Sequence, residues 1–528
     1  MRLFLTGLGK FLGFIFGPLI NYIKSKSVAR GICISFGASI LFGSLPLYIS
    51  EFGNLSLIDS LYLSASAFCV TGLSPVPISE LSRITQIILI LYVQMGGLGI
   101  IVVTVLIGML VITGLSRNTQ LQSFITEVLD ANIQKADKKL KEKKNETDRI
   151  VRVIISIFNI TITLELIGTI ALFFFLPHKE TATFQEKLFD SLFTCISAFN
   201  NAGFSVYDDL GFTMYHTPSM IVISSLIILG GIGYPVIIFI EKFVLKIFIR
   251  IFNHLEVWGE TYLMMKAIKG KDPNALDYFF TQMSGWTQNR IEDYNSNLTG
   301  ESNRVQTNII LKGSLILVFG GAISILLLEY NNPLSIGSLS FSDKVLNSFF
   351  ISVSSRTAGF STISLNDISD PTIVLITLLM FVGGGPQGTA GGIKITTFVI
   401  LVKYLANVIS SKSLVEIFGN TISKRSVAMS IRLYFLATSA LALVIFILTI
   451  FHNDKNKIPE IVFEVISAFS TVGFSLGITN TISAYEKIIY VLLMYVGRIG
   501  IFTVLIALTG NPVTSQVGQD DGLKIQVG

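Results

Sequence analysis

Long apolar stretches constrain this chain more than any other feature of its sequence. Each is about 20 residues or longer, the length at which a helix crosses roughly 30 Å of hydrocarbon. Only helices and closed barrels satisfy their backbone polar groups in that layer. Because 51% of the 528 residues are apolar and only 14% are charged, against about a quarter in soluble domains, the sequence predicts an all-α polytopic membrane protein. Its eight predicted spans lie near residues 31–50, 84–111, 150–176, 218–240, 308–328, 371–405, 430–451 and 484–508.

Basic residues indicate how the chain is oriented. They gather before the first span (Lys24, Lys26 and Arg30), at 135–144, and between the sixth and seventh spans. Lysine and arginine are enriched in cytoplasmic loops, and an even number of spans leaves both termini on one side. We therefore expect a multi-pass protein of the cell membrane with both termini in the cytoplasm. The net charge is only +5, and no basic face carries interleaved aromatic residues, so nucleic-acid binding has little support.

The beginning of the chain allows more than one interpretation. For residues 1–27 we expect an amphipathic helix on the membrane surface, because Lys10 interrupts the apolar core and no cleavage motif follows. A cleaved signal and a further span are the alternatives. The three cysteines, Cys33, Cys69 and Cys195, lie in apolar surroundings without metal-ligand spacing, so we expect neither a disulfide framework nor a zinc site.

A short glycine-containing string occurs four times, each time between two predicted spans. Each string ends an apolar stretch too short to cross a membrane, and three of them follow Ser-Ala-Phe. A glycine cluster (GGLG, GGIG, GGGP or GRIG) begins 24, 27, 24 and 24 residues after the glycine of the respective string. Two features that keep register indicate one supersecondary unit used four times. The strings are CVTGLS at 69–74, NNAGFS at 200–205, RTAGFS at 356–361 and STVGFS at 470–475.

A short helix that enters the membrane and returns explains such a unit. Non-helical backbone at that depth is tolerated when it lines a water-filled path, and the carboxyl end of each helix dipole favours a cation. Acidic residues lie near the starts of three of these helices, at Asp59, Asp190 and Glu460. Glycine permits the positive-φ backbone conformation that directs successive carbonyls toward one point. Rings of such carbonyls can replace the hydration shell of potassium. A tight turn without an ion is the alternative for each glycine taken singly.

These strings, together with GGGPQGTAGGIK at 383–394, resemble the Trk/Ktr/HKT superfamily of potassium transporters, and most of all its eight-span Ktr-type membrane subunit. The resemblance covers roughly residues 28–510. It implies four span–pore-loop–span repeats with pseudo-fourfold symmetry around one ion pore. The residues that match the family's selectivity filter are Val70, Thr71, Gly72 and Leu73; Asn201, Ala202, Gly203 and Phe204; Thr357, Ala358, Gly359 and Phe360; and Thr471, Val472, Gly473 and Phe474.

The resemblance also implies the function and the partners. We expect potassium uptake through a gated, potassium-selective pore, with potassium as the transported ion, sodium as an activator and no covalently bound cofactor. Gly72 favours potassium, because relatives with serine there tend toward sodium. The partners implied are a second copy in a homodimer, a cytosolic ring of nucleotide-binding (RCK-type) regulatory subunits, and the lipid membrane.

The sixth predicted span is too long to be one helix. Its 35 residues, 371–405, would reach about 52 Å as a helix, and glycines with a proline break it in the middle. The break also fits GxGxxG, but no strand–turn–helix unit surrounds it, so a dinucleotide site is not expected. By resemblance this glycine-rich loop gates the pore. The residues assigned to the gate are Gly383, Gly384, Gly385, Pro386, Gln387, Gly388, Thr389, Ala390, Gly391, Gly392 and Arg498.

Four charged residues within predicted membrane regions need an explanation. Arg498 is expected to hold the glycine-rich loop through its carbonyls or to repel cations, with a clamp between helices as the alternative. Arg356 is expected to fix its own pore loop. Glu165 is expected to be a buried partner rather than part of an ion pathway. Lys394 is expected to mark the cytoplasmic mouth, with a snorkelling lysine as the alternative.

Two other classes of protein are less consistent with these motifs. Only four histidines are present, without metal-ligand spacing, a nucleophile elbow or paired carboxylates, so an enzyme is not expected. A carrier that alternates access is the stronger rival, since it also uses broken helices, but repeats that share one orientation favour a pore. Connection 114–149 and insertion 245–305 are expected to be cytoplasmic, with regulatory contacts or mere solvation as alternatives.

The predicted organisation divides the chain into nine segments. They are a surface segment at 1–27, repeat 1 at 28–113, a charged connection at 114–149, repeat 2 at 150–244, an insertion at 245–305, repeat 3 at 306–408, a connection at 409–428, repeat 4 at 429–510 and a cytoplasmic tail at 511–528.

Overall fold

The computed structural model describes most of the four predicted repeats and the end of the tail. The described residues are 28–99, 137–177, 182–207, 216–237, 239–240, 301–411, 414–451, 457–509 and 522–527. The predictions for the surface segment, for the connection as far as residue 136 and for the insertion as far as residue 300 concern residues outside these ranges.

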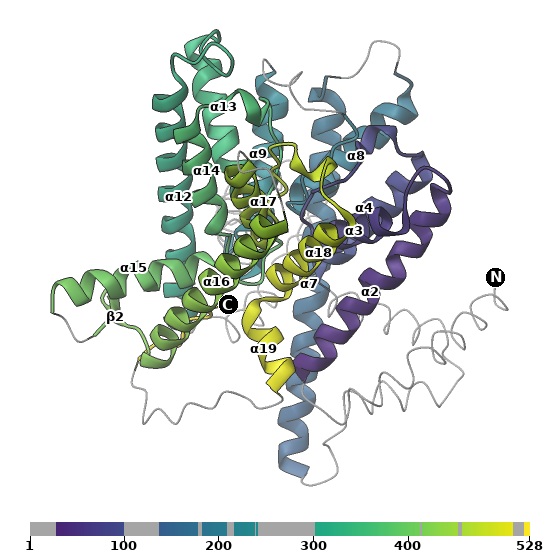
Figure 1. Cartoon of the computed structure of the whole chain (residues 1–528). Coiled ribbons are helices and arrows are strands. Elements are labelled where there is room, and N and C mark those ends of the chain that lie inside the picture. Colours follow the sequence, from purple (N-terminus) through teal and green to yellow (C-terminus); the bar gives the residue numbers. More distant parts are fainter. Residues whose placement is uncertain are drawn as a thin grey trace, which may run out of the picture.

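Each repeat folds as a long helix, a short helix and a closing helix, and we call these four groups units 1 to 4 (Figure 1). Unit 1 consists of α2 (Val28–Ser50), α3 (Leu57–Phe68) and α4 (Arg83–Leu98), and unit 2 of α7 (Asp137–Phe175), α8 (Phe184–Phe199) and α9 (Thr217–Gly231). Unit 3 consists of α12 (Glu301–Glu329), α13 (Phe341–Ser354), α14 (Asp370–Phe381) and α15 (Ile395–Ile409), and unit 4 of α16 (Lys424–Phe451), α17 (Ile458–Ser470), α18 (Ala484–Ile499) and α19 (Ile501–Thr509). In units 3 and 4 a fourth helix follows the closing helices, which are α14 and α18.

Minor elements complete the units. Three 3-10 turns, η1 (Ile78–Glu80), η3 (Leu365–Asp367) and η5 (Ile478–Asn480), follow the predicted filter strings of units 1, 3 and 4. Two short strands, β1 (Glu416–Ile417) and β2 (Asn420–Thr421), form an antiparallel hairpin between units 3 and 4.

The first helix of every unit is long enough to cross a membrane. Among the described residues, four helical segments pass this test: Ala29–Ser50, Ser156–Phe175, Ser302–Glu329 and Lys424–Phe451. The eighth predicted span, 484–508, is not one straight helix. The chain bends by 96° between α18 and α19, because Gly500 has a φ of +91°, which interrupts the helix. The predicted break in the sixth span is confirmed, since α14 ends at Phe381 and α15 begins at Ile395.

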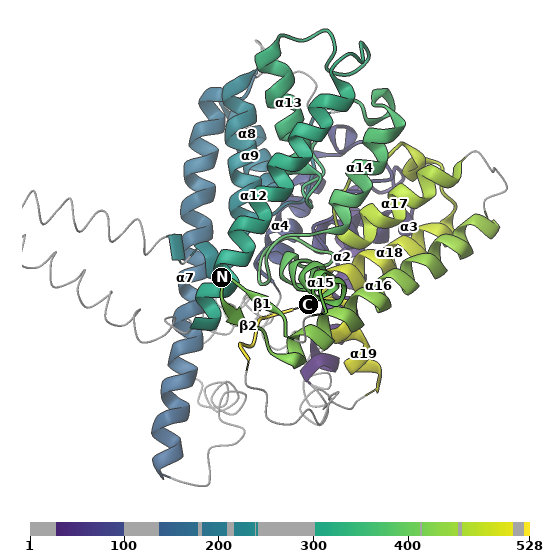
Figure 2. The same cartoon turned by 90° about the vertical axis from the view of Figure 1, so that its left-hand side faces the viewer.

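The units contact one another in cyclic order. The closing helix of each unit packs on the short helix of the next, in the pairs α4 with α8, α9 with α13, α14 with α17 and α18 with α3. The last pair returns to unit 1, so the ring of units is closed. Buried apolar clusters fill the same four interfaces, and the two views agree that the short helices lie among the longer ones (Figures 1 and 2).

Buried glutamates fix the entry to two closing helices, a feature that the sequence analysis missed. Glu51, just after α2, accepts hydrogen bonds from Ser82 N (2.5 Å) and Thr85 Oγ1 (2.8 Å) at the start of α4. Glu329, at the end of α12, accepts from Ser369 N (2.9 Å) at the start of α14. Burial by itself raises the pKa of Glu51, but the hydrogen bonds more than offset it and leave the pKa below its ordinary value.

Candidate ion-filter site

Each short helix ends where a predicted filter segment begins, and local sequence explains where each helix starts. Ser56 and Ser340 cap α3 and α13 through their hydroxyls, and Thr183 caps α8 in a capping box with Glu186. Asp59 and Glu460 lie in the first turns of α3 and α17, as predicted.

The prediction for Asp190 is wrong. Because α8 begins at Phe184, earlier than the apolar stretch suggested, Asp190 lies in the middle of that helix. Its carboxylate accepts a hydrogen bond from the Tyr207 hydroxyl (3.1 Å) and forms an ion pair with Arg83 (3.4 Å).

The four predicted filter segments share one unusual backbone. The glycines have φ values of +92°, +70°, +74° and +93° in chain order. The residue two positions before each glycine is also left-handed, although it is not glycine: Val70 (+57°), Asn201 (+59°), Thr357 (+87°) and Thr471 (+52°). Such conformations cost a side-chain-bearing residue roughly 1–2 kcal/mol and gather at functional sites. The repetition in all four units argues against an incidental turn.

The serine of the Ser-Ala-Phe motif ties three of these segments to their helices. Ser66 Oγ accepts from Gly72 N (3.1 Å), and Ser467 Oγ accepts from Gly473 N (3.2 Å). Ser197 Oγ instead donates to the carbonyl of Phe204 (2.7 Å). In unit 3 valine occupies this register, and Gly359 N donates to the backbone carbonyl of Ser354 (3.2 Å). The motif is therefore a hydroxyl brace for the filter backbone.

The four glycines form a closed ring of contacts. A Cβ on each one would overlap a backbone carbonyl oxygen of the next unit. The sequence of contacts returns from unit 4 to unit 1, as expected for four segments around one axis. The pairs are Gly72 with Ala202 O, Gly203 with Ala358 O, Gly359 with Val472 O, and Gly473 with Thr71 O.

The residue after each glycine anchors its segment in the interface with the preceding unit. Phe204 packs with residues of units 1 and 2, Phe360 with units 2 and 3, and Phe474 with units 3 and 4. Leu73 closes the cycle between units 4 and 1. All four are at most 2% exposed, so they act as packing anchors while their backbone faces the ring.

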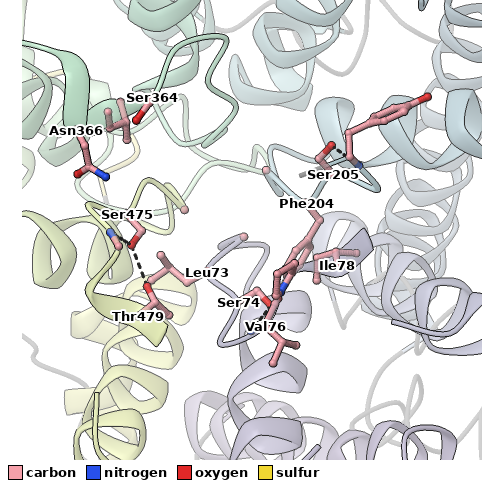
Figure 3. Close-up of a pocket in the computed structure, with 17 residues that line it drawn as sticks. Leu73, Ser74, Val76, Ile78, Phe204, Ser205, Ser364, Asn366, Ser475 and Thr479 are labelled. Carbon is pink, nitrogen blue, oxygen red and sulfur yellow. Dashed lines mark hydrogen bonds between the residues drawn. The ribbon is translucent and has the colours of Figure 1, made fainter. Parts of the chain in front are cut away.

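A cavity of about 380 Å³ lies over the ring on the side away from the glycine-rich loop. Gly72, Gly203 and Gly473 reach it, and all four units contribute to its walls. In Figure 3, Asn366 from unit 3 lies on the same side of the cavity as Ser475 and Thr479 from unit 4. Ser74 from unit 1 and Ser205 from unit 2 lie on the other side. The walls are uncharged and rich in hydroxyl and backbone oxygens, a surface suited to a partly hydrated cation.

The glycine clusters of the closing helices also have a structural reason. The first cluster glycine packs on the carbonyl at the end of the short helix, in the pairs Gly96 with Phe68 O, Gly230 with Phe199 O and Gly497 with Phe469 O. The contact is the same in unit 2, although the spacing there is 27 rather than 24 residues. In unit 3, Gly383 packs on Gly391 O instead, because the chain leaves the helix at this point.

The glycine-rich loop lies between the closing helix of unit 2 and the filter segment of unit 4. Gly385 N and Thr389 N donate to the carbonyls of Gly231 (2.9 Å) and Gly230 (3.3 Å). At its other end a Cβ on Gly391 would overlap the Thr471 hydroxyl. Side chains at these glycines would separate the loop from its neighbours, which accounts for its composition.

Three cations donate hydrogen bonds to carbonyls of this loop. Arg498 donates to Thr389 O and also to Gly96 O at the end of α4. Arg356 donates to Gly383 O (3.1 Å), so its bond goes to the glycine-rich loop, a contact that the sequence did not indicate. Lys394 folds back onto Ala390 O (2.5 Å). The arrangement holds the loop at both ends and in the middle.

Glu165 lies in a polar network beside the short helix of unit 2. Its carboxylate accepts hydrogen bonds from Gln94 (3.0 Å) and from Asn200 (3.1 Å), and the residue is 5% exposed. Asn200 precedes the filter segment of unit 2 and also donates to Gln94 (2.9 Å). These contacts are those of a buried helix-packing acid.

Four helical units whose short helices converge on one ring of glycines define a membrane transport protein of the polytopic helical class. Residues 25–512 match the TrkH family, described as a cation transport protein. The chain belongs to this family.

Similar proteins agree with this assignment. The Ktr system potassium uptake protein B of Bacillus subtilis is 30% identical over 89% of this chain and 91% of its own length. The potassium/sodium uptake protein NtpJ of Enterococcus hirae is 28% identical over 90% of each chain. The crystal structure of the potassium transporter TrkH from Vibrio parahaemolyticus matches with a TM-score of 0.60, covering 91% of this chain and 84% of that chain, and at 18% identity it supports the fold alone.

Proposed function

We propose that this protein takes up potassium across the cell membrane through one gated, potassium-selective pore. The observation that carries the proposal is the ring in which each left-handed glycine faces a carbonyl of the next unit. Backbone carbonyls arranged around a point can replace the hydration shell of potassium. The carboxyl ends of the four short helices precede these segments, and their dipoles favour a cation.

The glycine-rich loop is the gate in this proposal. It lies against the filter segment of unit 4, and Arg356, Lys394 and Arg498 are bonded to its carbonyls. Three cations close to a cation path oppose conduction, because like charges in a medium of low dielectric repel strongly. Opening would then require the loop and these cations to move together.

Sodium stimulation, the homodimer and a cytosolic ring of nucleotide-binding subunits complete the proposal. One relative is named a potassium/sodium uptake protein, which supports including a second ion. Others are named Ktr system potassium uptake proteins, and the word "system" supports including further subunits. The proposed location is the cell membrane with both termini in the cytoplasm, which puts the cavity of Figure 3 at the outer mouth.

Uptake of rubidium and sodium by the purified protein in liposomes tests the function. We expect rubidium to enter selectively and at a higher rate when sodium is present outside. Sodium flux without rubidium flux would contradict potassium selectivity. A low, saturating rate with a fixed ratio of the two ions would favour an alternating-access carrier over a pore.

A further inference from the structure

The last residues of the chain dock on the face of the molecule that carries the glycine-rich loop. Leu523 pairs with Ile422 as a parallel bridge. Its backbone N–H donates to Thr421 O (2.8 Å), and its carbonyl accepts from Ser423 N (3.0 Å). The tail thus lies along the chain just after β2, and Figure 2 shows this yellow segment beside the hairpin.

Apolar packing and several polar contacts hold the tail in place, and Leu523 and Val527 pack beside Ile525. Ile525 is 4% exposed and packs in a cluster built from α12, α15 and the hairpin. Its backbone N–H donates to Ser426 Oγ (3.2 Å) in α16. Gln306 in α12 accepts from Gln526 N (3.1 Å), and Ser302 donates to the carbonyl of Lys524.

From this position the tail reaches the tip of the glycine-rich loop and the helix that follows the loop. Gln387, near the tip of the loop, donates through Nε2 to Gln526 Oε1 (3.1 Å). Thr396, two residues beyond the loop in the first turn of α15, donates through Oγ1 to Gln526 O (2.8 Å). A single tail residue therefore bridges the tip of the loop and the helix that follows it.

We propose that residues 522–527 are a latch that holds the glycine-rich loop in the position described above. When the tail is docked, the loop stays against units 2 and 4. When the tail leaves, the loop loses its contact at Gln387, the helix after it loses the contact at Thr396, and the loop moves more readily. The latch rests on the proposed function, since it controls the proposed gate. The described tail of residues 522–527 buries one side chain, Ile525, with Leu523 and Val527 partly buried beside it. A segment with so few buried apolar side chains opens more easily than the helices it rests on, as a releasable element requires.

Cross-linking tests the docked position without reference to transport. Cysteines placed at Gln387 and Gln526, in a protein whose buried native cysteines are replaced by alanine, should be joined by a short bifunctional thiol reagent. Ile525→Asp, which places a charge in the apolar cluster, should abolish the link. The link forms within one chain or between two copies, and either product supports the latch. Absence of the link in a correctly folded protein overturns it.

Rubidium uptake by liposomes, without any regulatory subunit, tests the control of the gate. We expect I525D and a chain ending at residue 521 to raise uptake by about tenfold, and Q526A to raise it by about two- to fivefold, the effect of one hydrogen bond on a two-state equilibrium. Lys524→Ala is the matched control. This side chain is exposed and makes no hydrogen bond among the residues that the structure describes, so uptake should stay at the wild-type rate.

The outcomes separate the latch from the proposed function. If I525D loses the cross-link but takes up rubidium at the wild-type rate, the latch is overturned and the transport function stands. If uptake falls in I525D and in the truncated chain, the tail supports conduction rather than restraining it, and the latch is also wrong. If no variant takes up rubidium, the transport function fails and the latch fails with it, whatever the cross-link shows.

Discussion

Gly473→Ser changes the predicted filter where unit 4 meets unit 1. The φ of this residue is +93°, a conformation that costs a residue with a side chain roughly 1–2 kcal/mol. A Cβ at this position would also overlap the carbonyl oxygen of Thr71. Close-packed backbone has no room to absorb such an overlap, so the Thr71 carbonyl or the filter segment of unit 4 must shift.

The shift matters because this carbonyl belongs to the ring. In the proposed filter, its displacement would change the distance at which an ion is coordinated, and the strain of the substitution would fall on the ion-bound form. Each 1.4 kcal/mol that destabilises the potassium-bound filter lowers the binding constant for potassium about tenfold. We therefore expect G473S to lower the preference for rubidium over sodium by about tenfold.

Paired fluxes of rubidium and sodium into liposomes measure this preference. Gly320→Ser in α12 is the matched control, because a Cβ there meets no atom within 4 Å. The control should keep the wild-type ratio. If G473S takes up ions at a measurable rate and also keeps the wild-type ratio of rubidium to sodium, the ring of glycines is not the selectivity filter.

Three further predictions concern the gate, the anchors and the glutamate contacts. Arg498→Ala should raise rubidium uptake without a regulator, because each charge-assisted bond to a carbonyl contributes about 1.5–3 kcal/mol; unaltered uptake in a folded protein would count against a restraining role. Phe204→Ala should destabilise the protein by about 3–5 kcal/mol, measured as a lower melting temperature, whereas the control Phe184→Ala, 67% exposed, should change it little. Because the folded protein depresses the pKa of Glu51, its contribution is complete above the unfolded pKa of about 4.3 and is lost as pH falls below it. Wild type should therefore lose more thermal stability than E51Q on acidification, and parallel losses would show that Glu51 contributes nothing.

The sequence predicted the parts of the fold that rest on repeated, local patterns. The short helices, the positions of the four glycine strings and the break at residues 383–394 follow from apolar length and from residues that cannot hold a helix. The spacing of 27 residues in unit 2 looked like an exception, yet Gly230 makes the same contact as Gly96 and Gly497. Packing at both ends of the segment, rather than its length, is what the repeat preserves.

Features that depend on distant parts of the chain escaped the sequence. Gly500 gave no sign that α18 and α19 meet at 96°, since a single glycine is tolerated in many helices. The bond from Arg356 to Gly383 joins residues from two segments, and only the packed fold shows it. The polar tail has no apolar period, so nothing in it indicated that Ile525 fills a cluster between α12 and α15.

The cyclic anchoring of the filter segments has a consequence for how the protein is made. Leu73 of unit 1 packs against unit 4, and unit 4 is the last to leave the ribosome. Until it arrives, one anchor of the first segment and one side of the ring are missing. A nascent chain with three units therefore lacks the contact of Gly473 with Thr71 O and the unit 4 side of the cluster around Leu73, so the ring of contacts closes only after the last unit has been synthesised.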